Sequence, residues 1–168
     1  MSDFNHELLE ACDIIPAFVP IDLAAGANNG QWVNMKYVSK LLAVLFKAAA
    51  GSGVEHPVFT LQQATSNAGA GAKALNFTRA RTKIGAIAST PAWTIATQAA
   101  ASTYTPTSST SQALIAVEIN QTDLDMANGF NFVQLSIPDV GVTAQIGCAF
   151  YIAAGLRYAQ SVTPSVLS

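Results

Sequence analysis

Hydrophobic residues follow two different periods along the chain, and the change comes near residue 16. In the first twelve residues, Phe4, Leu8 and Cys12 recur four positions apart among polar neighbours, which is the spacing of one face of a short amphipathic helix. Three helical turns are marginal alone in water, so this helix is expected to dock on its own domain or to reach a neighbouring subunit as an arm. We name Phe4, Leu8 and Leu9 as possible inter-subunit contacts.

From Pro16 onward, short apolar segments are separated by clusters of Gly, Pro, Asn, Ser and Thr, which is typical of strands joined by turns. Within segments, apolar residues alternate with polar ones, as Phe59 and Leu61 do around Thr60. A period of two indicates a sheet with one buried face. The predicted strands are 17–23, 31–35, 39–48, 58–64, 75–87, 92–99, 114–120, 130–137 and 144–153.

Eight or nine strands with no strong helix after residue 12 predict an all-β fold. The expected architecture is a two-layer β-sandwich with a jelly-roll or another Greek-key topology. An immunoglobulin-like sandwich is the alternative, although the chain lacks the Cys–Trp–Cys spacing of that fold. With no internal repeat and no clear linker, the expected division is an N-terminal helix or arm (1–15), a sandwich domain (16–160) and a C-terminal tail (161–168).

Composition adds that the surface carries unusually little charge. Charged residues are 11% of the 168 residues, against roughly 25% in a typical soluble domain, while 51% are hydrophobic. No apolar stretch approaches the roughly 20 residues of a membrane-spanning helix, and the N-terminus lacks the basic start of a secretory signal. We expect a soluble protein, made in the cytoplasm, that forms a homo-oligomer, because charged residues are depleted where subunits meet.

The basic residues do not indicate a nucleic acid partner. Net charge is −2, and the eight Lys and Arg residues are scattered rather than gathered in a dense basic footprint. Arg79, Arg81 and Lys83 recur at every second position and so share one face of their strand. We expect that face to be solvated or salt-bridged, or to pair with an acidic patch on a partner.

The chain offers few groups for catalysis or metal binding. His6 and His56 have no metal-site spacing, and Cys12 and Cys148 have neither metal-ligand nor redox spacing, so we expect two buried thiols in a reducing compartment. Residues 69–74 match a relaxed dinucleotide fingerprint, but a strand is predicted where that motif requires a helix. We therefore expect no enzymatic activity and no cofactor.

One polar cluster, Asp123, Asp125 and Asn128, carries oxygen atoms that calcium could use. It is not an EF-hand, because position twelve of such a loop would be Gln134 instead of a bidentate Glu. The favoured interpretation is that these side chains bond to their own backbone and build a tight connection between two strands. A cation site is the alternative.

Several stretches between residues 16 and 158 carry a resemblance: 18–30 (FVPIDLAAGANNG), 59–64 (FTLQQA), 74–79 (ALNFTR), 123–130 (DLDMANGF) and the closing 151–158. Together they resemble small virion structural proteins of tailed bacteriophages, of the head decoration or cement type. The resemblance implies a β-rich subunit on the capsid surface that binds and stabilises the lattice of the major capsid protein. The implied partners are that protein and copies of this chain, without a substrate.

Two other functions stay open from the sequence. A phage tail component would share the same structural character. A carbohydrate-binding sandwich module would use exposed aromatic residues to bind the sugar. The same residues are more often explained by core packing or by anchoring at an interface. The aromatic candidates are Trp32, Trp93, Tyr104, Tyr151 and Tyr158.

Overall fold

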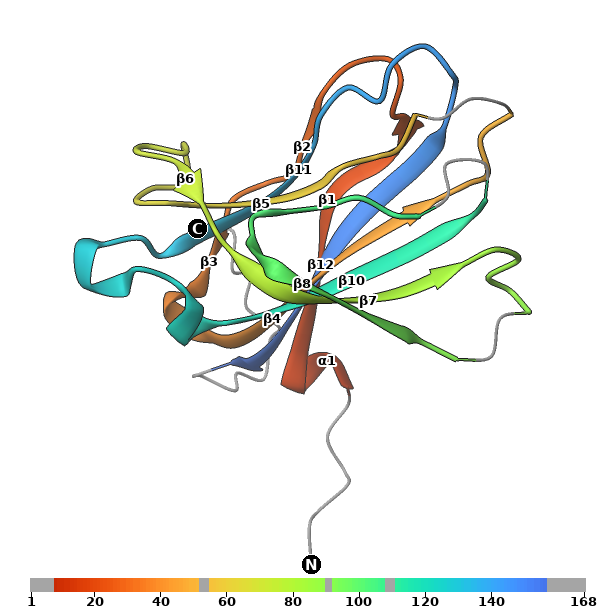
Figure 1. Cartoon of the computed structure of the whole chain (residues 1–168). Helices are drawn as coiled ribbons and strands as arrows, with labels where there is room; N and C mark the ends of the chain where they lie inside the picture. The colour runs from red at the N-terminus through yellow and green to blue at the C-terminus, as the bar shows by residue number, and fades with distance from the viewer. Residues whose placement is uncertain (1–7, 52–54, 90–91, 108–110, 157–168) are drawn as a thin grey trace, which may run out of the picture.

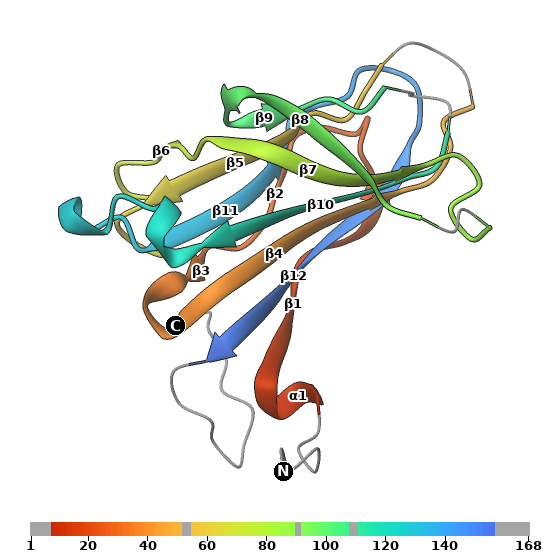
Figure 2. The same ribbon diagram turned by 60° about the horizontal axis from the view of Figure 1, so that its bottom comes forward.

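The computed structural model describes residues 8–51, 55–89, 92–107 and 111–156. This part of the chain is all-β: it forms two antiparallel sheets of six strands each, with no helix of seven or more residues. The arrangement is consistent with the expected β-sandwich. Figures 1 and 2 show the course of the strands from two directions.

Sheet A contains the long strands and has the order β1-β12-β4-β10-β7-β8, with all neighbours antiparallel. The strands are β1 (Cys12–Asp22), β4 (Val38–Lys47), β7 (Phe77–Ile84), β8 (Thr94–Ala101), β10 (Ala113–Asn120) and β12 (Ile146–Leu156).

Sheet B is shorter and has the order β2-β11-β5-β6, with β3 also paired to β11 and β9 to β5. Its strands are β2 (Asn28–Asn29), β3 (Val33–Asn34), β5 (Phe59–Ala64), β6 (Lys73–Ala74), β9 (Thr103–Tyr104) and β11 (Phe132–Ile137). The remaining elements are α1 (Leu8–Ala11) and three 3₁₀ turns, η1 (Met35–Tyr37), η2 (Gln121–Asp123) and η3 (Met126–Asn128).

Each of the nine predicted strand segments overlaps an observed strand, although several of these strands begin or end beyond the predicted bounds. The segment predicted over 75–87 ends early, at Ile84, because Gly85 takes a positive φ of 114° and turns the chain. Strands β2, β6 and β9 have no counterpart among the predictions. Each spans only two residues, which is too short for a period of two to be visible.

The N-terminal helix differs from its prediction. Among the described residues, α1 covers only Leu8–Ala11, and residues 1–7 lie outside the description. Cys12, expected on the helical face, is the first residue of β1 and lies opposite Ala154 of β12. The strand partner decides its conformation, because tertiary pairing overrides a weak local helical preference.

One hydrophobic core joins the two sheets. Leu41 and Leu45 of β4 are fully buried, as are Val133 and Leu135 of β11, and all four belong to a single cluster that draws on both sheets. Complete burial of such a side chain contributes about 1.5–3 kcal/mol. The inner faces of the two sheets therefore form the core, and the residues on the opposite side of sheet A, such as Val44 and Ala116, do not belong to this cluster.

Candidate functional site

The side of sheet A that points away from the core is largely apolar. Residues directly opposite one another in neighbouring strands lie on the same face of a sheet. We call this surface the outer face, and three rows of paired residues define it. The rows are Ile14, Ile152, Leu42 and Glu118; Pro16, Phe150, Val44, Ala116, Arg81 and Ile95; and Cys148, Phe46, Leu114 and Lys83.

Several apolar side chains of the outer face are open to solvent. Ile14 is 52% exposed, Ile95 46% and Phe46 42%, while Phe150 and Ile152 are half-buried and Val44 and Ala116, in the middle row, are buried. An antiparallel sheet in a two-layer fold buries one face and usually presents polar residues on the other. Large apolar side chains gathered at a surface commonly mark an interaction site. The outer face is therefore the candidate functional site.

The outer face was not predicted, although the sequence contains a signal for it. Apolar residues run without interruption from Leu41 to Phe46, so β4 lacks the alternation that β5 shows. An uninterrupted apolar run is typical of a strand that is covered on both faces. In β4 the odd positions 41, 43 and 45 are fully buried in the core, and the even positions 42, 44 and 46 belong to the outer face.

A basic group borders the apolar rows. Arg79, Arg81 and Lys83 lie on β7 at every second position and share one face of the strand, as predicted. The pairing of Arg81 with Ala116 and of Lys83 with Leu114 shows that this face belongs to the outer face. The Lys83 ammonium lies 5.2 Å from the ring centroid of Trp93, within cation–π range. In the part of the chain that the structure describes, neither guanidinium group takes part in an ion pair or a side-chain hydrogen bond.

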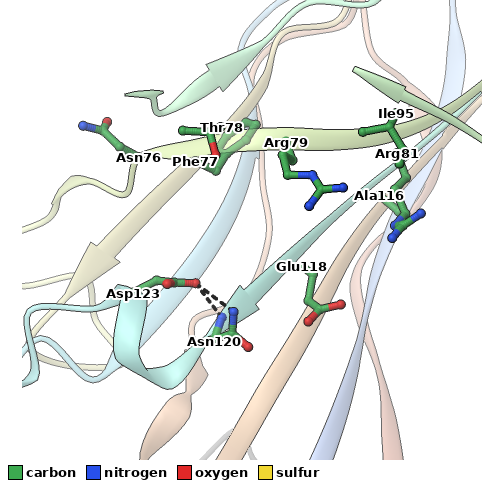
Figure 3. Close-up of a pocket in the computed structure, with 10 residues that line it drawn as sticks. All are labelled: Asn76, Phe77, Thr78, Arg79, Arg81, Ile95, Ala116, Glu118, Asn120 and Asp123. Carbon is green, nitrogen blue, oxygen red and sulfur yellow. Dashed lines mark hydrogen bonds between the residues drawn. The ribbon is translucent and has the colours of Figure 1, made fainter. Parts of the chain in front are cut away.

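A hollow of about 460 Å³ lies beside the two arginines. It forms because β7 and β10 are paired only along Ala113–Ala116 of β10 and are unpaired beyond that point. Figure 3 shows the side chains of Arg79 and Arg81 in the space between the two strands. Phe77, Ala116 and Ile95 add apolar lining, so the hollow combines positive charge with apolar walls.

The acidic residues of the hollow already have partners. The Lys40 ammonium contacts the Glu118 carboxylate at 3.0 Å. Asp123 accepts hydrogen bonds from the Asn120 backbone N–H at 2.7 Å and from its side-chain amide at 3.3 Å, which closes the η2 turn. The unengaged charge in the hollow is therefore positive, and the arrangement can accept a carboxylate or another anion.

The cluster Asp123, Asp125 and Asn128 does not converge on one point. Asp125 accepts from the Lys73 ammonium at 2.6 Å, and the Asn128 side-chain amide donates to both of its oxygens at 2.9 Å. These bonds hold the pKa of Asp125 below its usual range, the hydrogen bond from Lys73 being the largest cause. Among the described residues, no group of three or more His, Cys, Asp or Glu side chains could hold a metal ion.

The predicted contact residues Phe4, Leu8 and Leu9 can be placed only in part. Phe4 lies outside the described residues, Leu8 begins α1, and Leu9 is 47% exposed. Their role in contacts between subunits stays a prediction.

The tryptophans do not form an open aromatic floor. Trp32 is half-buried against the turn at Gly69, where an added Cβ would approach its indole nitrogen to 2.9 Å. Trp93 is 41% exposed but has Lys83 over its ring. Neither tryptophan lines the hollow beside Arg79.

The remaining candidates from the sequence stay apart in the structure. Residues 69–72 form a turn that leads into β6 and then β7, with strand where a dinucleotide site requires a helix. Cys12 is buried and Cys148 half-buried, and burial raises the pKa of the Cys148 thiol. His56 has a buried Nδ1 without a hydrogen-bond partner among the described residues.

Comparison with known proteins finds no relative. No protein family model matches the sequence, and neither the curated proteins nor the solved structures contain a match. Within the described residues, no helix is long and apolar enough to cross a membrane.

Proposed function

We propose that this chain is a structural subunit that works by binding other protein subunits, and that the outer face of sheet A is its docking face. The observation that carries the proposal is the set of three mainly apolar rows on the side of the sheet opposite the core. A partner that covers these rows removes Ile14, Phe46 and Ile95 from water, which is favourable at about 25 cal/mol per Å² of apolar surface.

The polar border supports a protein partner with defined chemistry. Arg79 and Arg81 have no ion-pair partner in the described part of the chain, and they adjoin the apolar rows. A complementary surface would present apolar side chains to the rows and a carboxylate to the arginines, because complementary charges fix the orientation of docking. Nucleic acid is not favoured, since only three basic residues gather here.

We further propose a jelly-roll topology for the sandwich. The strand pairs are nested: β1 pairs with β12 in sheet A, β2 and β3 with β11 in sheet B, β4 with β10 in sheet A, and β5 with β6 in sheet B. This is the order expected when one long hairpin is rolled over two sheets, with β7 and β8 as an addition at one edge. Viral capsid and lectin domains share this fold, which alone does not decide between functions.

The resemblance to phage virion proteins is the support for proposing that this subunit belongs to a phage head. There it would decorate the lattice of the major capsid protein and act as a cement protein. A protein that binds only the assembled shell stabilises that shell by mass action, so no catalytic group is required. The outer face of sheet A would supply the contact.

The proposal can be tested with Phe46→Asp, which puts a charge in the middle of the third row. Tyr37→Asp is the matched control, because Tyr37 is 47% exposed, close to the 42% of Phe46, but lies on the η1 turn. Binding is measured to empty expanded heads of the virus that encodes the chain, prepared without it. We expect Phe46→Asp to weaken binding about tenfold or more, or about 1.4 kcal/mol, and Tyr37→Asp to leave it unchanged.

Wild-type protein that fails to bind such heads would overturn the decoration role. Immunogold labelling of whole particles then separates the head from the tail, since a tail component would label tails only. Equal binding by both variants would show that the outer face is not the docking face.

A further inference from the structure

The segment that precedes β1 carries acidic charge and no basic charge. Between residues 1 and 11 the carboxylates belong to Asp3, Glu7 and Glu10, and the sequence has neither Lys nor Arg there. Phe4 follows directly after the first of these carboxylates. The segment thus combines negative charge with a large apolar side chain, which complements the outer face of sheet A.

One apolar residue of α1, Leu9, is largely exposed in its own domain. Leu9 is 47% exposed, although it lies next to the start of β1. A single helical turn has little stability in water without packing. The exposure of Leu9 therefore leaves this side chain open to a surface outside the same chain.

The receiving surface is ready for a carboxylate. Arg79 and Arg81 have no ion-pair partner in the described part of the chain, so a new pair there displaces no existing one. Both line the hollow between β7 and β10, together with apolar Phe77 and Ala116. Figure 3 shows the two guanidinium groups between these strands.

We propose that residues 1–11 of a second copy of the chain dock on the outer face of sheet A. Asp3 or Glu7 pairs with Arg79 and Arg81, and Phe4 packs against the apolar rows. The inference rests on the docking face proposed above and names a second copy of the chain as its occupant in the free dimer, so the segment must leave the face before a capsid lattice covers it. Two copies that exchange these segments about a twofold axis make each contact twice, which gives a closed dimer.

The same segment is also long enough to reach the hollow of its own chain. Cys12, Ala154, Lys40 and Asn120 form one row across sheet A, and Asn120 lines the hollow. Three strand spacings separate the ends of that row, about 14 Å, whereas seven extended residues span at most about 25 Å. The test must therefore separate exchange between copies from docking within one chain.

Cross-linking between two different single variants makes this separation. Asn5→Cys and Ile95→Cys are prepared in a Cys148→Ser background, because Cys148 belongs to the outer face. Ile95 lies opposite Arg81 and is 46% exposed. We expect mild oxidation of the mixture to give a disulfide-linked heterodimer, and a mixture of Asn5→Cys with Val142→Cys, which is 92% exposed in the loop between β11 and β12, to give none.

Two results overturn the inference. One is the absence of the heterodimer. The other is a double variant Asn5→Cys/Ile95→Cys that forms its disulfide only within a monomer, because the segment then docks on its own chain.

Sedimentation equilibrium separates the inference from the proposed function. We expect Asp3→Asn/Glu7→Gln and Arg79→Ala/Arg81→Ala each to raise the dimer dissociation constant about tenfold, and Lys36→Ala, an exposed charge on η1, to leave it unchanged.

If Phe46→Asp abolishes head binding while the four charge substitutions leave association unchanged, the docking face stands and its occupant is wrong. If Phe46→Asp changes neither head binding nor association, both proposals fail. A wild-type chain that is monomeric at all concentrations overturns the dimer proposed here. The proposed function is tested separately, by head binding.

Discussion

The hydroxyl of Tyr151 in sheet A accepts a hydrogen bond from the backbone N–H of Leu135 in sheet B at 2.7 Å. The same hydroxyl donates to the carbonyl oxygen of Gln31 at 3.1 Å. Tyr151 is fully buried, so these bonds form away from water, and burial raises the pKa of its phenol. The pair connects the two sheets through a polar contact inside an otherwise apolar core.

Tyr151→Phe is expected to destabilise the fold by about 1–3 kcal/mol, because it leaves the buried N–H of Leu135 without its acceptor. Urea unfolding followed by circular dichroism measures the change. Tyr104→Phe is the control, since Tyr104 is only half-buried, at the end of β9. Equal stability of wild type and Tyr151→Phe would mean that the contact contributes nothing.

Gly30→Ala should also destabilise the protein, because the backbone of Gly30 lies against this contact. A Cβ at residue 30 would come within 2.6 Å of the Tyr151 hydroxyl and 2.8 Å of the Leu135 carbonyl oxygen. The Gly30 N–H donates to that same oxygen at 2.8 Å, so the backbone cannot simply move away. We expect a loss of about 1–3 kcal/mol in urea unfolding.

The two substitutions should couple. Removal of the hydroxyl relieves part of the clash, so Gly30→Ala should cost less in the Tyr151→Phe background than in wild type. Additive losses in this double-mutant cycle would contradict the proposed close approach.

Neighbouring leucines of β4 should behave differently in the isolated chain. Leu41 is fully buried in the core, whereas Leu42 is half-buried on the outer face. We expect Leu41→Ala to cost about 2–5 kcal/mol in urea unfolding and Leu42→Ala clearly less. In binding to heads, Leu42→Ala should weaken the affinity more than Leu41→Ala does. A Leu42→Ala variant with unchanged affinity would count against the docking face.

Lys73→Met should raise the pKa of Asp125, because the 2.6 Å contact with the Lys73 ammonium is the largest cause of the lowered value. Carboxyl carbon NMR titration measures the pKa directly. A carboxyl whose pKa is lower in the folded state contributes stability above its unfolded pKa and loses it as pH falls. The stability difference between wild type and Lys73→Met should therefore be present at neutral pH and disappear in acid. An unchanged pKa in Lys73→Met would assign the shift to Asn128 instead.

Periodicity predicted burial correctly in β5, where one face of the strand meets the core. The alternation of β5 predicts Phe59 and Leu61 as buried, and both are fully buried. It failed at Cys12, because the helical spacing of the first residues is a local signal and pairing with Ala154 is a long-range one. It also did not predict β2, β6 and β9, because each of these strands has only two residues and forms by pairing with a neighbouring strand.

The candidate site shows the same division. The sequence by itself determined that the chain is all-β, that charge is scarce, and that Arg79, Arg81 and Lys83 share one face of a strand, because these properties depend on composition and on the alternation within single segments. Only the tertiary structure decided that Ile14, Phe150, Phe46 and Leu114 lie together on the outer side of sheet A beside those arginines. The reason is physical: the rows join residues from strands far apart in the chain, and the register of each pair is set by the packing of the whole sheet.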